Sequence, residues 1–399
     1  MAQTNKRAIH ADLNELMNIL SKPRPNGSKA LQDTRDALVS WLSDHEIPYM
    51  YHSYQVRPYF MEAVGLSLLL PQALLVLAIW FRLGWPSLII AVVGLLVAQL
   101  EARGTPLLSR IGTDESENII IEFAPFQPSQ ELILSAHYDS KTELMDHRLR
   151  AVFVDRLPIA AVLSLILGIL GLVDGFLRPS SDIAYYIGIG LSIPHIILVA
   201  GVAANFIFGR FAKPPSQGAV DNGAACAILL DLARRLKDRD LTLKQTKLTI
   251  ALFTGEEIAA QGSAAYVADR EWPLPVIALN LEWCGQDGPY ITWNRFGGGP
   301  IPEYLATSVL NDAVAAAVNH FEQEIKPLEG PVGTDSVPFL AKGIPATSIG
   351  MMDRELGIEG FHRPADNLER VVIERMPETE NIVAHILAEY DSGSLAVGK

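Results

Sequence analysis

Cysteine is scarce in this chain, with only Cys226 and Cys284 among 399 residues. Two cysteines cannot build the disulfide framework of a small secreted domain, and these two lack the CxxC spacing of a redox or zinc motif. The chain therefore fits a reducing compartment. The first ten residues also lack an apolar core behind their charges, so we expect no cleavable signal peptide.

Charged side chains are also few, and the acidic ones predominate. Asp, Glu, Lys and Arg make up 19% of the residues, whereas hydrophobic residues make up 49%. Soluble domains usually carry about 25% charged residues. The formal net charge of −13 excludes the basic face that nucleic-acid binding requires, so we expect no nucleic-acid partner.

Long apolar runs are present instead, and they indicate a membrane protein. A helix that spans a bilayer needs about 17–25 apolar residues. The sequence predicts four such helices as two hairpins, at residues 63–81, 83–100, 157–177 and 183–208. Trp80 and Trp85 flank the break at Arg82, where an interfacial aromatic belt would lie. For the first pair, a buried hydrophobic hairpin in a soluble core is the alternative.

Asp174 and His195 lie within the later two runs. Ionisable side chains inside spanning segments often have a function. With only two of them, we favour the simpler interpretation, in which His195 is neutral and bonded to a neighbouring helix and Asp174 lies at the membrane interface.

The basic residues near the runs predict an orientation. Four spans put residues 1–60, 101–156 and 209–399 on one side of the membrane. That side carries Arg57, Arg103, Arg110, Arg148, Arg150, Arg156, Arg210 and Lys213, whereas the opposite loops carry Arg82 and Arg178. The positive-inside rule then predicts a multi-pass protein of the plasma (inner) membrane whose soluble part faces the cytoplasm.

The remaining segments alternate between strand-like and helix-like patterns, which favours an α/β domain with a mostly parallel sheet. Strands are predicted at 118–123, 131–136, 247–253, 276–282 and 345–350, and helices at 8–21, 29–45, 222–237, 258–270, 303–320 and 376–393. The predicted division is a soluble domain of residues 1–58, 113–156 and 209–399, interrupted by membrane hairpins at 59–112 and 157–208.

Several acidic and histidine residues follow these strands. His137 and Asp139 form an His-x-Asp pair after strand 131–136, which puts both side chains on one face, so that Asp139 could orient the imidazole for metal binding. Taken by itself, the pair is a weak signal, and a surface turn is the favoured interpretation. Glu282 ends strand 276–282, and a lone carboxylate at that point has no other evident explanation.

Glu256 and Glu257 follow strand 247–253. One of two adjacent carboxylates can bind a metal while the other acts as a general base. A solvated helix start is the alternative for this pair. Asp221 precedes helix 222–237, where a helix cap is the alternative. His362 lies in a loop, where a single histidine is usually a surface residue.

Taken in order, these positions resemble the M28 family of zinc aminopeptidases. The resemblance rests on His137-Tyr-Asp139, Asp221, Glu256-Glu257, Asn280-Leu-Glu282 and Phe-His362-Arg-Pro-Ala-Asp366. It also includes the stretches Arg24-Pro-Asn-Gly-Ser28, Gly333-Thr-Asp335-Ser and Lys342-Gly-Ile-Pro345. It covers nearly all of the chain outside the apolar runs.

The resemblance implies a three-layer zinc-peptidase sandwich that binds two Zn²⁺ ions per chain. Asp221 would bridge the two ions. Glu257 and His362 would complete one site, and His137 and Glu282 would complete the other. Glu256 would be the catalytic base, and Asp139 would orient His137.

The chain departs from the family pattern at two positions. Glu282 stands where the family has Asp, which puts the placement of the second metal in doubt. Ser336 replaces the family's His after Asp335, which puts a substrate contact there in doubt.

The expected function is therefore a membrane-anchored metallo-aminopeptidase that cleaves N-terminal peptide bonds, with a peptide as substrate and the bilayer as partner. The sequence does not decide whether the chain forms an oligomer. One alternative is an acyltransferase with a single zinc, like the glutaminyl cyclases of the same superfamily, although the retained His137 and the Glu256-Glu257 pair argue against it. The other is a catalytically silent scaffold, although every ligand position still holds a competent side chain.

Overall fold

The computed structural model describes residues 2–178, 180–238, 241–298, 301–355, 357 and 360–395, with backbone alone for residues 2–10. The chain forms two compact units. One, here called the sheet domain, comprises Met1–Pro58, Asp114–Lys141 and Lys213–Lys399. The other, here called the helical bundle, comprises Tyr59–Thr113 and Thr142–Ala212.

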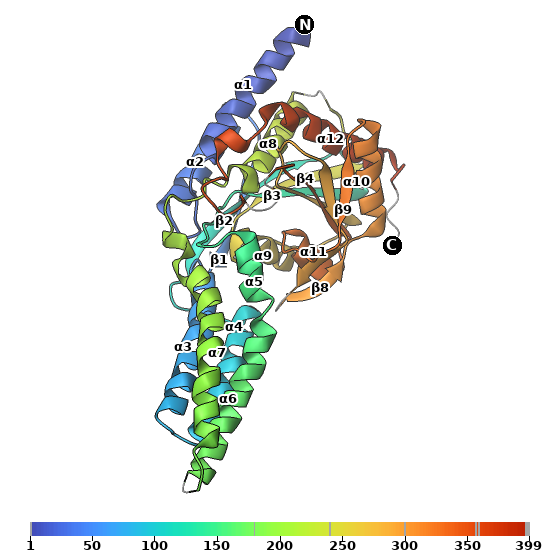
Figure 1. Cartoon of the computed structure of the whole chain (residues 1–399). Helices are drawn as coiled ribbons and strands as arrows, with labels where there is room; N and C mark the ends of the chain where they lie inside the picture. Colours follow the sequence, from blue (N-terminus) through green and yellow to red (C-terminus); the bar gives the residue numbers. More distant parts are fainter. Residues whose placement is uncertain are drawn as a thin grey trace. The chain divides into compact units, whose positions relative to one another are not determined.

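Within the described residues, the sheet domain contains an eight-stranded sheet in the order β1-β2-β4-β3-β5-β10-β6-β9 (Figure 1). Strands β4, β3, β5 and β10 run parallel, whereas β1-β2, β2-β4 and β10-β6 pair antiparallel. The bounds are β1 Met50–Val56, β2 Asp114–Phe123, β3 Gln130–His137, β4 Thr246–Phe253, β5 Val276–Glu282, β6 Tyr290–Trp293, β9 Ile325–Leu328 and β10 Ala346–Met351. Strands β7 (Arg295–Gly298) and β8 (Ile301–Leu305) form a separate pair.

Helices cover both faces of the sheet, because side chains that alternate along each strand are apolar on both sides. Leu132 and Leu134 of β3 belong to one core, whereas Ile133 between them belongs to the opposite core. The larger core lies under α1 (Ala2–Leu20), α2 (Lys29–Asp44), α8 (Ala224–Lys237), α10 (Ser308–His320) and α12 (Met376–Ser392). The smaller core lies under α9 (Gln261–Asp269) and α11 (Ser336–Ala341).

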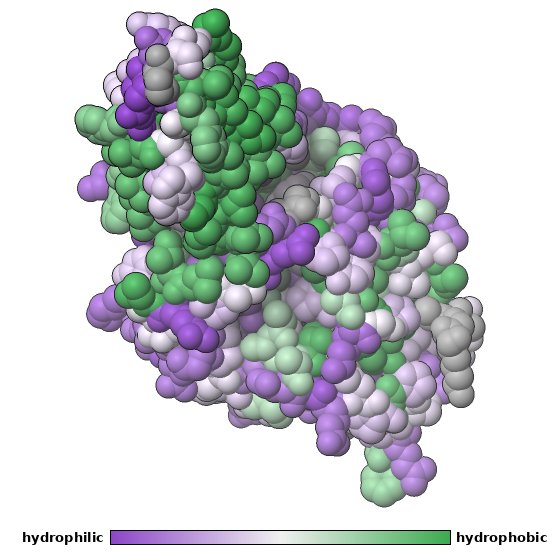
Figure 2. Space-filling model, turned by 90° about the horizontal axis from the view of Figure 1, so that it is seen from below, coloured by the Kyte–Doolittle hydropathy of each residue, from purple (hydrophilic) through white to green (hydrophobic). Residues whose placement is uncertain are grey.

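The helical bundle consists of α3 (Phe60–Trp80), α4 (Pro86–Ala102), α5 (His147–Val154), α6 (Leu157–Leu177) and α7 (Ile183–Phe208). The four longer helices pack against one another. Glycines permit this close packing: a Cβ at Gly171 of α6 would lie 2.5 Å from the Cβ of Ser87 in α4. Apolar side chains gather on the outer surface of these helices (Figure 2).

Among the described residues, three helical segments are long and apolar enough to cross a membrane: Phe60–Trp80, His147–Leu177 and Ile183–Phe211. Helix α4 is equally apolar but has only 17 residues. The structure therefore contains helices suited to a membrane, and the number of four spans stays a prediction.

The two ionisable residues of the apolar runs are both hydrogen-bonded. His195 Nε2 lies 3.0 Å from Gln72 Oε1 of α3, and Ser164 Oγ of α6 donates to the same oxygen at 2.8 Å. Asp174 accepts two hydrogen bonds from Arg82, at 2.6 and 3.0 Å. His195 is thus bonded to a neighbouring helix, and Asp174 lies near the end of its own helix. Both observations agree with the simpler interpretation, in which neither residue has a separate function.

The structure corrects some expectations about the elements. The central strands β4, β3, β5 and β10 are parallel as predicted, but the sheet as a whole is mixed, because β1, β2 and β6 are joined through antiparallel pairs. The helix predicted at 303–320 begins at Ser308, and Ile301–Leu305 forms β8 instead. Residues 142–156, predicted in the soluble domain, group with the bundle because Phe153 of α5 packs on Gly201 of α7. Residues 396–399, the end of the predicted domain, lie outside the described residues.

Candidate metal centre

His137 and Asp139 are placed by the end of β3. Strand β3 lies between β4 and β5, so its last residue, His137, is fully buried at the carboxyl edge of the sheet. His137 Nδ1 faces Asp139, 3.3 Å from its carbonyl oxygen and 3.5 Å from Oδ1. This contact leaves Nε2 directed at other residues, as expected for a histidine whose tautomer is set by its second nitrogen.

Glu282 reaches His137 from the neighbouring strand. Its Oε1 lies 3.1 Å from His137 Nε2, and its Oε2 accepts a hydrogen bond from Asn280 Nδ2 at 2.8 Å. Asn280 in turn accepts from Ser135 Oγ at 2.9 Å. Because β3 and β5 are parallel and Ser135 is in register with Asn280, the two strands together hold the Glu282 carboxylate in one orientation.

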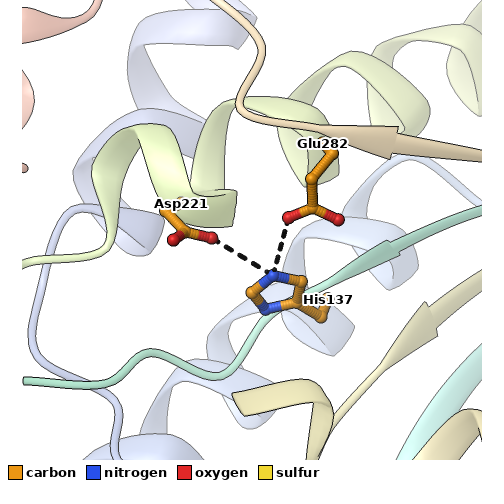
Figure 3. Close-up of side chains that lie close together, drawn as sticks. All are labelled: His137, Asp221 and Glu282. Carbon is orange, nitrogen blue, oxygen red and sulfur yellow. Dashed lines mark hydrogen bonds and ion pairs between the residues drawn. The ribbon is translucent and has the colours of Figure 1, made fainter. Parts of the chain in front are cut away.

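Asp221 lies between the two histidines. It belongs to a short irregular turn, Ala219–Gly223, which precedes α8. Its Oδ1 is 3.3 Å from His137 Nε2, and its Oδ2 is 3.2 Å from His362 Nε2. Figure 3 shows Asp221 and Glu282 converging on the same nitrogen of His137. A single carboxylate with one oxygen toward each histidine has the geometry of a bridging ligand.

Glu257 completes the second group. It lies in the helical turn Glu256–Ile258 that follows β4, and its Oε2 is 3.0 Å from His362 Nε2. The other oxygen of Glu257, Oε1, is buried and has no hydrogen-bond partner among the described residues. His362 has a positive φ of 56°, a strained conformation of the kind found at functional sites.

Two sets of three side chains could each hold a metal ion: His137, Asp221 and Glu282, and Asp221, Glu257 and His362. In each set, one ligand atom per residue lies within 4.8 Å of the others. Each set offers one imidazole nitrogen and two carboxylate oxygens, the donors that Zn²⁺ accepts. Buried carboxylates need a compensating cation, and the unpaired Glu257 Oε1 agrees with that need. The residues present therefore fit divalent ions.

Glu256 is near both sets but belongs to neither. Its Oε2 lies 3.8 Å from His137 Nε2, farther than the oxygens of Asp221 and Glu282. Its side chain is 13% exposed, whereas Asp221, Glu257 and Glu282 are at most 5% exposed. Among these carboxylates, Glu256 is the one that solvent and a substrate reach most readily.

Asn26 is a site residue to which the sequence assigned no role. Its Nδ2 donates to Asp139 Oδ2 at 2.7 Å. The backbone amides of Glu256 and Glu257 donate to the two oxygens of Asp139 at 3.4 and 3.2 Å. Asp139 thus connects His137 to the Glu256-Glu257 turn. Asn26 lies in the predicted turn after Arg24, and this position is the one sequence signal that could have pointed to it.

The charges in the centre shift one another's pKa values. Burial opposes a charged His137, but the surrounding carboxylates, Glu282 first, outweigh it and raise the pKa of the imidazole above its usual value. Burial raises the pKa of Glu256 and of Glu282. For Asp221, hydrogen bonds from His137 and His362 outweigh burial and lower the pKa. Asp221 is therefore held as an anion.

Asp335 and Ser336 lie behind the centre rather than on its surface. Ser336 is buried, and its Oγ donates to the carbonyl of Thr347 at 3.0 Å. Asp335 is fully buried and accepts from Ser263 Oγ at 2.5 Å, and burial raises its pKa to about 7. Ser336 therefore holds α11 against β10, which agrees with the doubt about a substrate contact at this position.

Part of the chain matches a known peptidase family. Residues 204–387 match peptidase family M28. The matched region contains Asp221, Glu256, Glu257, Glu282 and His362, whereas His137 and Asp139 precede it. The match confirms the predicted family resemblance for this part of the chain and supports a hydrolytic enzyme.

A curated relative matches less than half of the chain. Aminopeptidase YwaD from Bacillus subtilis (strain 168) is 23% identical over 192 residues, which are 44% of this chain and 38% of YwaD. The chain thus spans less than half the length of this curated relative.

Two solved structures share the fold of nearly the whole chain. One is BSAP, a zinc aminopeptidase from Bacillus subtilis, with a TM-score of 0.54, 12% identity, and coverage of 96% of this chain and 94% of BSAP. The other is the glutaminyl cyclase of Porphyromonas gingivalis, with a TM-score of 0.53, 13% identity, and coverage of 96% and 97%. The predicted α/β peptidase fold is confirmed at this level.

Proposed function

We propose that this chain is a membrane-anchored zinc aminopeptidase that hydrolyses the N-terminal peptide bond of peptides with two metal ions. The observation that carries the proposal is the position of Asp221, whose two oxygens face His137 and His362 at 3.3 and 3.2 Å. One carboxylate is then shared by two complete ligand sets. The match of residues 204–387 to peptidase family M28 supports the hydrolytic activity.

In this proposal His137 and Glu282 would hold one Zn²⁺, Glu257 and His362 would hold the other, and Asp221 would contribute one oxygen to each set. Bound there, the ions supply positive charge that polarises the scissile carbonyl and makes a water molecule easier to deprotonate. The surrounding residues fix the ligands: Asp139 orients His137 through Nδ1, and Asn280 orients Glu282. Held in this way, the ligands need no rearrangement when substrate arrives.

Glu256 is assigned the proton transfers. It accepts the proton of the attacking water and then gives it to the leaving amine of the cleaved peptide, so that one carboxylate acts first as base and then as acid. Its greater exposure and its 3.8 Å distance from His137 Nε2 place it beside the ligands without making it one of them. The hydrogen bond from its amide to Asp139 fixes the turn that carries it.

The helical bundle is proposed as the membrane anchor. Three segments of it are long and apolar enough to span a bilayer, and we include α4 as a fourth span because its hairpin partner α3 is one of the three. The basic residues near the predicted membrane ends favour an orientation in which the sheet domain faces the cytoplasm at the plasma (inner) membrane, and this orientation is part of the proposal.

A glutaminyl-cyclase-like acyl transfer with one zinc is the second candidate, favoured by the shared fold with the Porphyromonas gingivalis enzyme. The two candidates differ in metal content. A single-zinc enzyme does not require the two separate sets that share Asp221, so we favour the aminopeptidase.

The test combines metal analysis with two substrate classes. The purified full-length protein should bind about two Zn²⁺ per chain, release amino acids from aminoacyl amides, and leave N-terminal glutaminyl peptides uncyclised. Glu256→Gln should remove hydrolysis while the two ions stay bound. One zinc per chain with cyclisation would establish the alternative, and no turnover of either substrate class by the zinc-loaded protein would point to a silent scaffold.

A further inference from the structure

Arg24 is a fully buried arginine in the sheet domain, close to the metal centre but not part of it. Its planar guanidinium donates hydrogen bonds to several carbonyl oxygens in fixed directions. The ammonium group of a lysine cannot reproduce this arrangement. The partners are the carbonyl oxygens of Leu20, Lys22, Tyr138, Gln217 and Gly218. Two of these belong to its own segment, and the other three belong to chain segments that are distant in sequence.

The distant partners lie on the two segments that flank the second of the two bundle insertions, residues 142–212. The leaving stem, residues 138–140, leads into the second part of the bundle, and the returning stem, residues 217–218, leads to Asp221. Arg24 Nε donates to the carbonyl of Tyr138 at 2.7 Å. Arg24 Nη1 and Nη2 donate to Gln217 and Gly218 at 2.8 and 2.9 Å. One side chain thus binds both stems.

The backbone of Arg24 adds to this connection. Its amide donates to Ser140 Oγ at 2.8 Å, and its carbonyl accepts from the amide of Ser140 at 3.1 Å. The stems also touch each other directly, because a Cβ at Gly218 would lie 2.5 Å from Ser140 Cβ and 3.0 Å from Arg24 Nη2. Gly218 has a φ of 61°, which favours glycine.

We infer that Arg24 is a positioning residue that clamps the two stems of the inserted residues 142–212, and so keeps His137 and Asp139 in register with Asp221. The inference rests on the proposed metal site. Arg24 would touch neither metal nor substrate, and it would act through the carbonyls that flank the ligands.

The position of the insertion explains why a clamp is needed. Residues 142–212, which belong to the bundle, separate the ligand His137 from the ligand Asp221. Movement of the bundle helices would otherwise be transmitted through the stems to the ligands. A metal site works only when its ligands are held within about 0.5 Å of the correct geometry. Hydrogen bonds between Arg24 and both stems oppose this movement at the point where the stems meet the sheet domain.

Arg24→Lys tests the inference in the full-length protein in detergent micelles. The change retains the positive charge but removes the fork that reaches both stems. Hydrogen–deuterium exchange is measured on zinc-depleted protein, so that it does not depend on catalysis. We expect exchange to increase about tenfold in residues 137–143 and 213–223, with little change in β5 and α12. Zinc affinity should fall by about tenfold or more, the size found for residues that orient ligands.

Arg270→Lys is the matched control. Arg270 is a second arginine of the sheet domain, part-buried, and it pairs with Glu131 and Tyr266, away from the stems. It should leave the exchange of both stems and the zinc affinity unchanged. If Arg24→Lys folds poorly, Ser140→Ala serves as a milder variant. It removes only the hydrogen bond that the Arg24 amide donates to Ser140 Oγ. It should loosen residues 137–143 more than the rest of the sheet domain.

The possible results distinguish a local effect of Arg24 on the stems from a general loss of stability, and from a failure of the proposed zinc site. A uniform rise in exchange across the sheet domain in Arg24→Lys and Ser140→Ala, or unchanged exchange in both stems, would overturn the inference. If the unsubstituted protein binds no zinc, the proposed function fails, but the exchange of the stems still reports on the clamp.

Discussion

Glu282 Oε1 lies 3.1 Å from His137 Nε2, across two adjacent parallel strands. The resembling family has the shorter Asp at this position, which raised a doubt about the second metal. In this chain the longer side chain reaches the histidine, and Asn280 holds its other oxygen at 2.8 Å. The extra methylene is therefore accommodated within an ordered hydrogen-bond network.

Glu282→Gln should weaken one metal site and spare the other. The change retains the shape but removes the charge that faces His137, so zinc affinity at this site should fall by more than the roughly 10–100-fold found for residues that only orient ligands. Zinc titration followed by mass spectrometry should then show one tightly bound ion instead of two. Glu369→Gln, at an exposed position, is the control and should keep both ions. Equal loss of both ions would contradict two separate ligand sets.

Gly218→Ala should destabilise the sheet domain more than the same change at a glycine with a similar backbone conformation elsewhere. Alanine at a positive φ costs about 1–2 kcal/mol, and a Cβ at Gly218 would also lie 2.5 Å from Ser140 Cβ. Gly343→Ala is the control, because Gly343 has a φ of 81° but a Cβ there would have no neighbouring atom within 4 Å. Thermal unfolding should show a clearly larger decrease for Gly218→Ala, and equal decreases would exclude the close approach of the stems.

Glu380→Gln should flatten the pH dependence of stability. Burial and the neighbouring Asp231 raise the pKa of Glu380 to about 8, although Arg235 lies 2.5 Å away. Unfolded glutamate titrates near pH ~4.3. Between these values the folded chain holds the extra proton, so this group's contribution to the free energy of unfolding decreases as pH rises.

The comparison is made by urea unfolding of both proteins between about pH 5 and pH 8, the window set by the two pKa values. The stability of Glu380→Gln relative to the unsubstituted protein should increase with pH, by at most about 1.4 kcal/mol per pH unit for one group. Subtracting the two curves removes the titration of all other groups. A difference that is constant with pH would mean that Glu380 stays ionised in the folded chain.

Gln72→Leu should loosen the helical bundle. Gln72 Oε1 accepts from Ser164 and lies 3.0 Å from His195 Nε2, so its removal leaves polar atoms on two other helices without this partner. Hydrogen bonds between membrane helices contribute about 0.6 kcal/mol on average and up to about 1.7 kcal/mol. Unfolding of the bundle in detergent should show a loss in this range, whereas Leu74→Val, at an exposed apolar position, should show little. A stable Gln72→Leu protein would argue that the contact contributes nothing.

Elements with a continuous pattern could be predicted from the sequence, and those without one could not. The buried strand that ends at His137 and the apolar helix α7 have many residues of one kind in a row, so their locations were predicted within a few residues. Strand β1 was missed because four of its seven residues are exposed, and β9 because it has four residues with Pro327 among them. Both strands form because their backbones pair with a neighbouring strand, β1 with β2 and β9 with β6.

The sequence by itself determined which side chains could bind metal, because the order of histidines and carboxylates after buried strands is a property of the chain. It also determined that residues between Asp139 and Asp221 form long apolar helices. Only the tertiary structure decided that Asp221 turns one oxygen to each histidine, and that Arg24 and Asn26 reach these loops from the N-terminal segment. The reason is physical: hydrogen bonds between distant segments depend on how strands and loops pack, and no local pattern of residues specifies them.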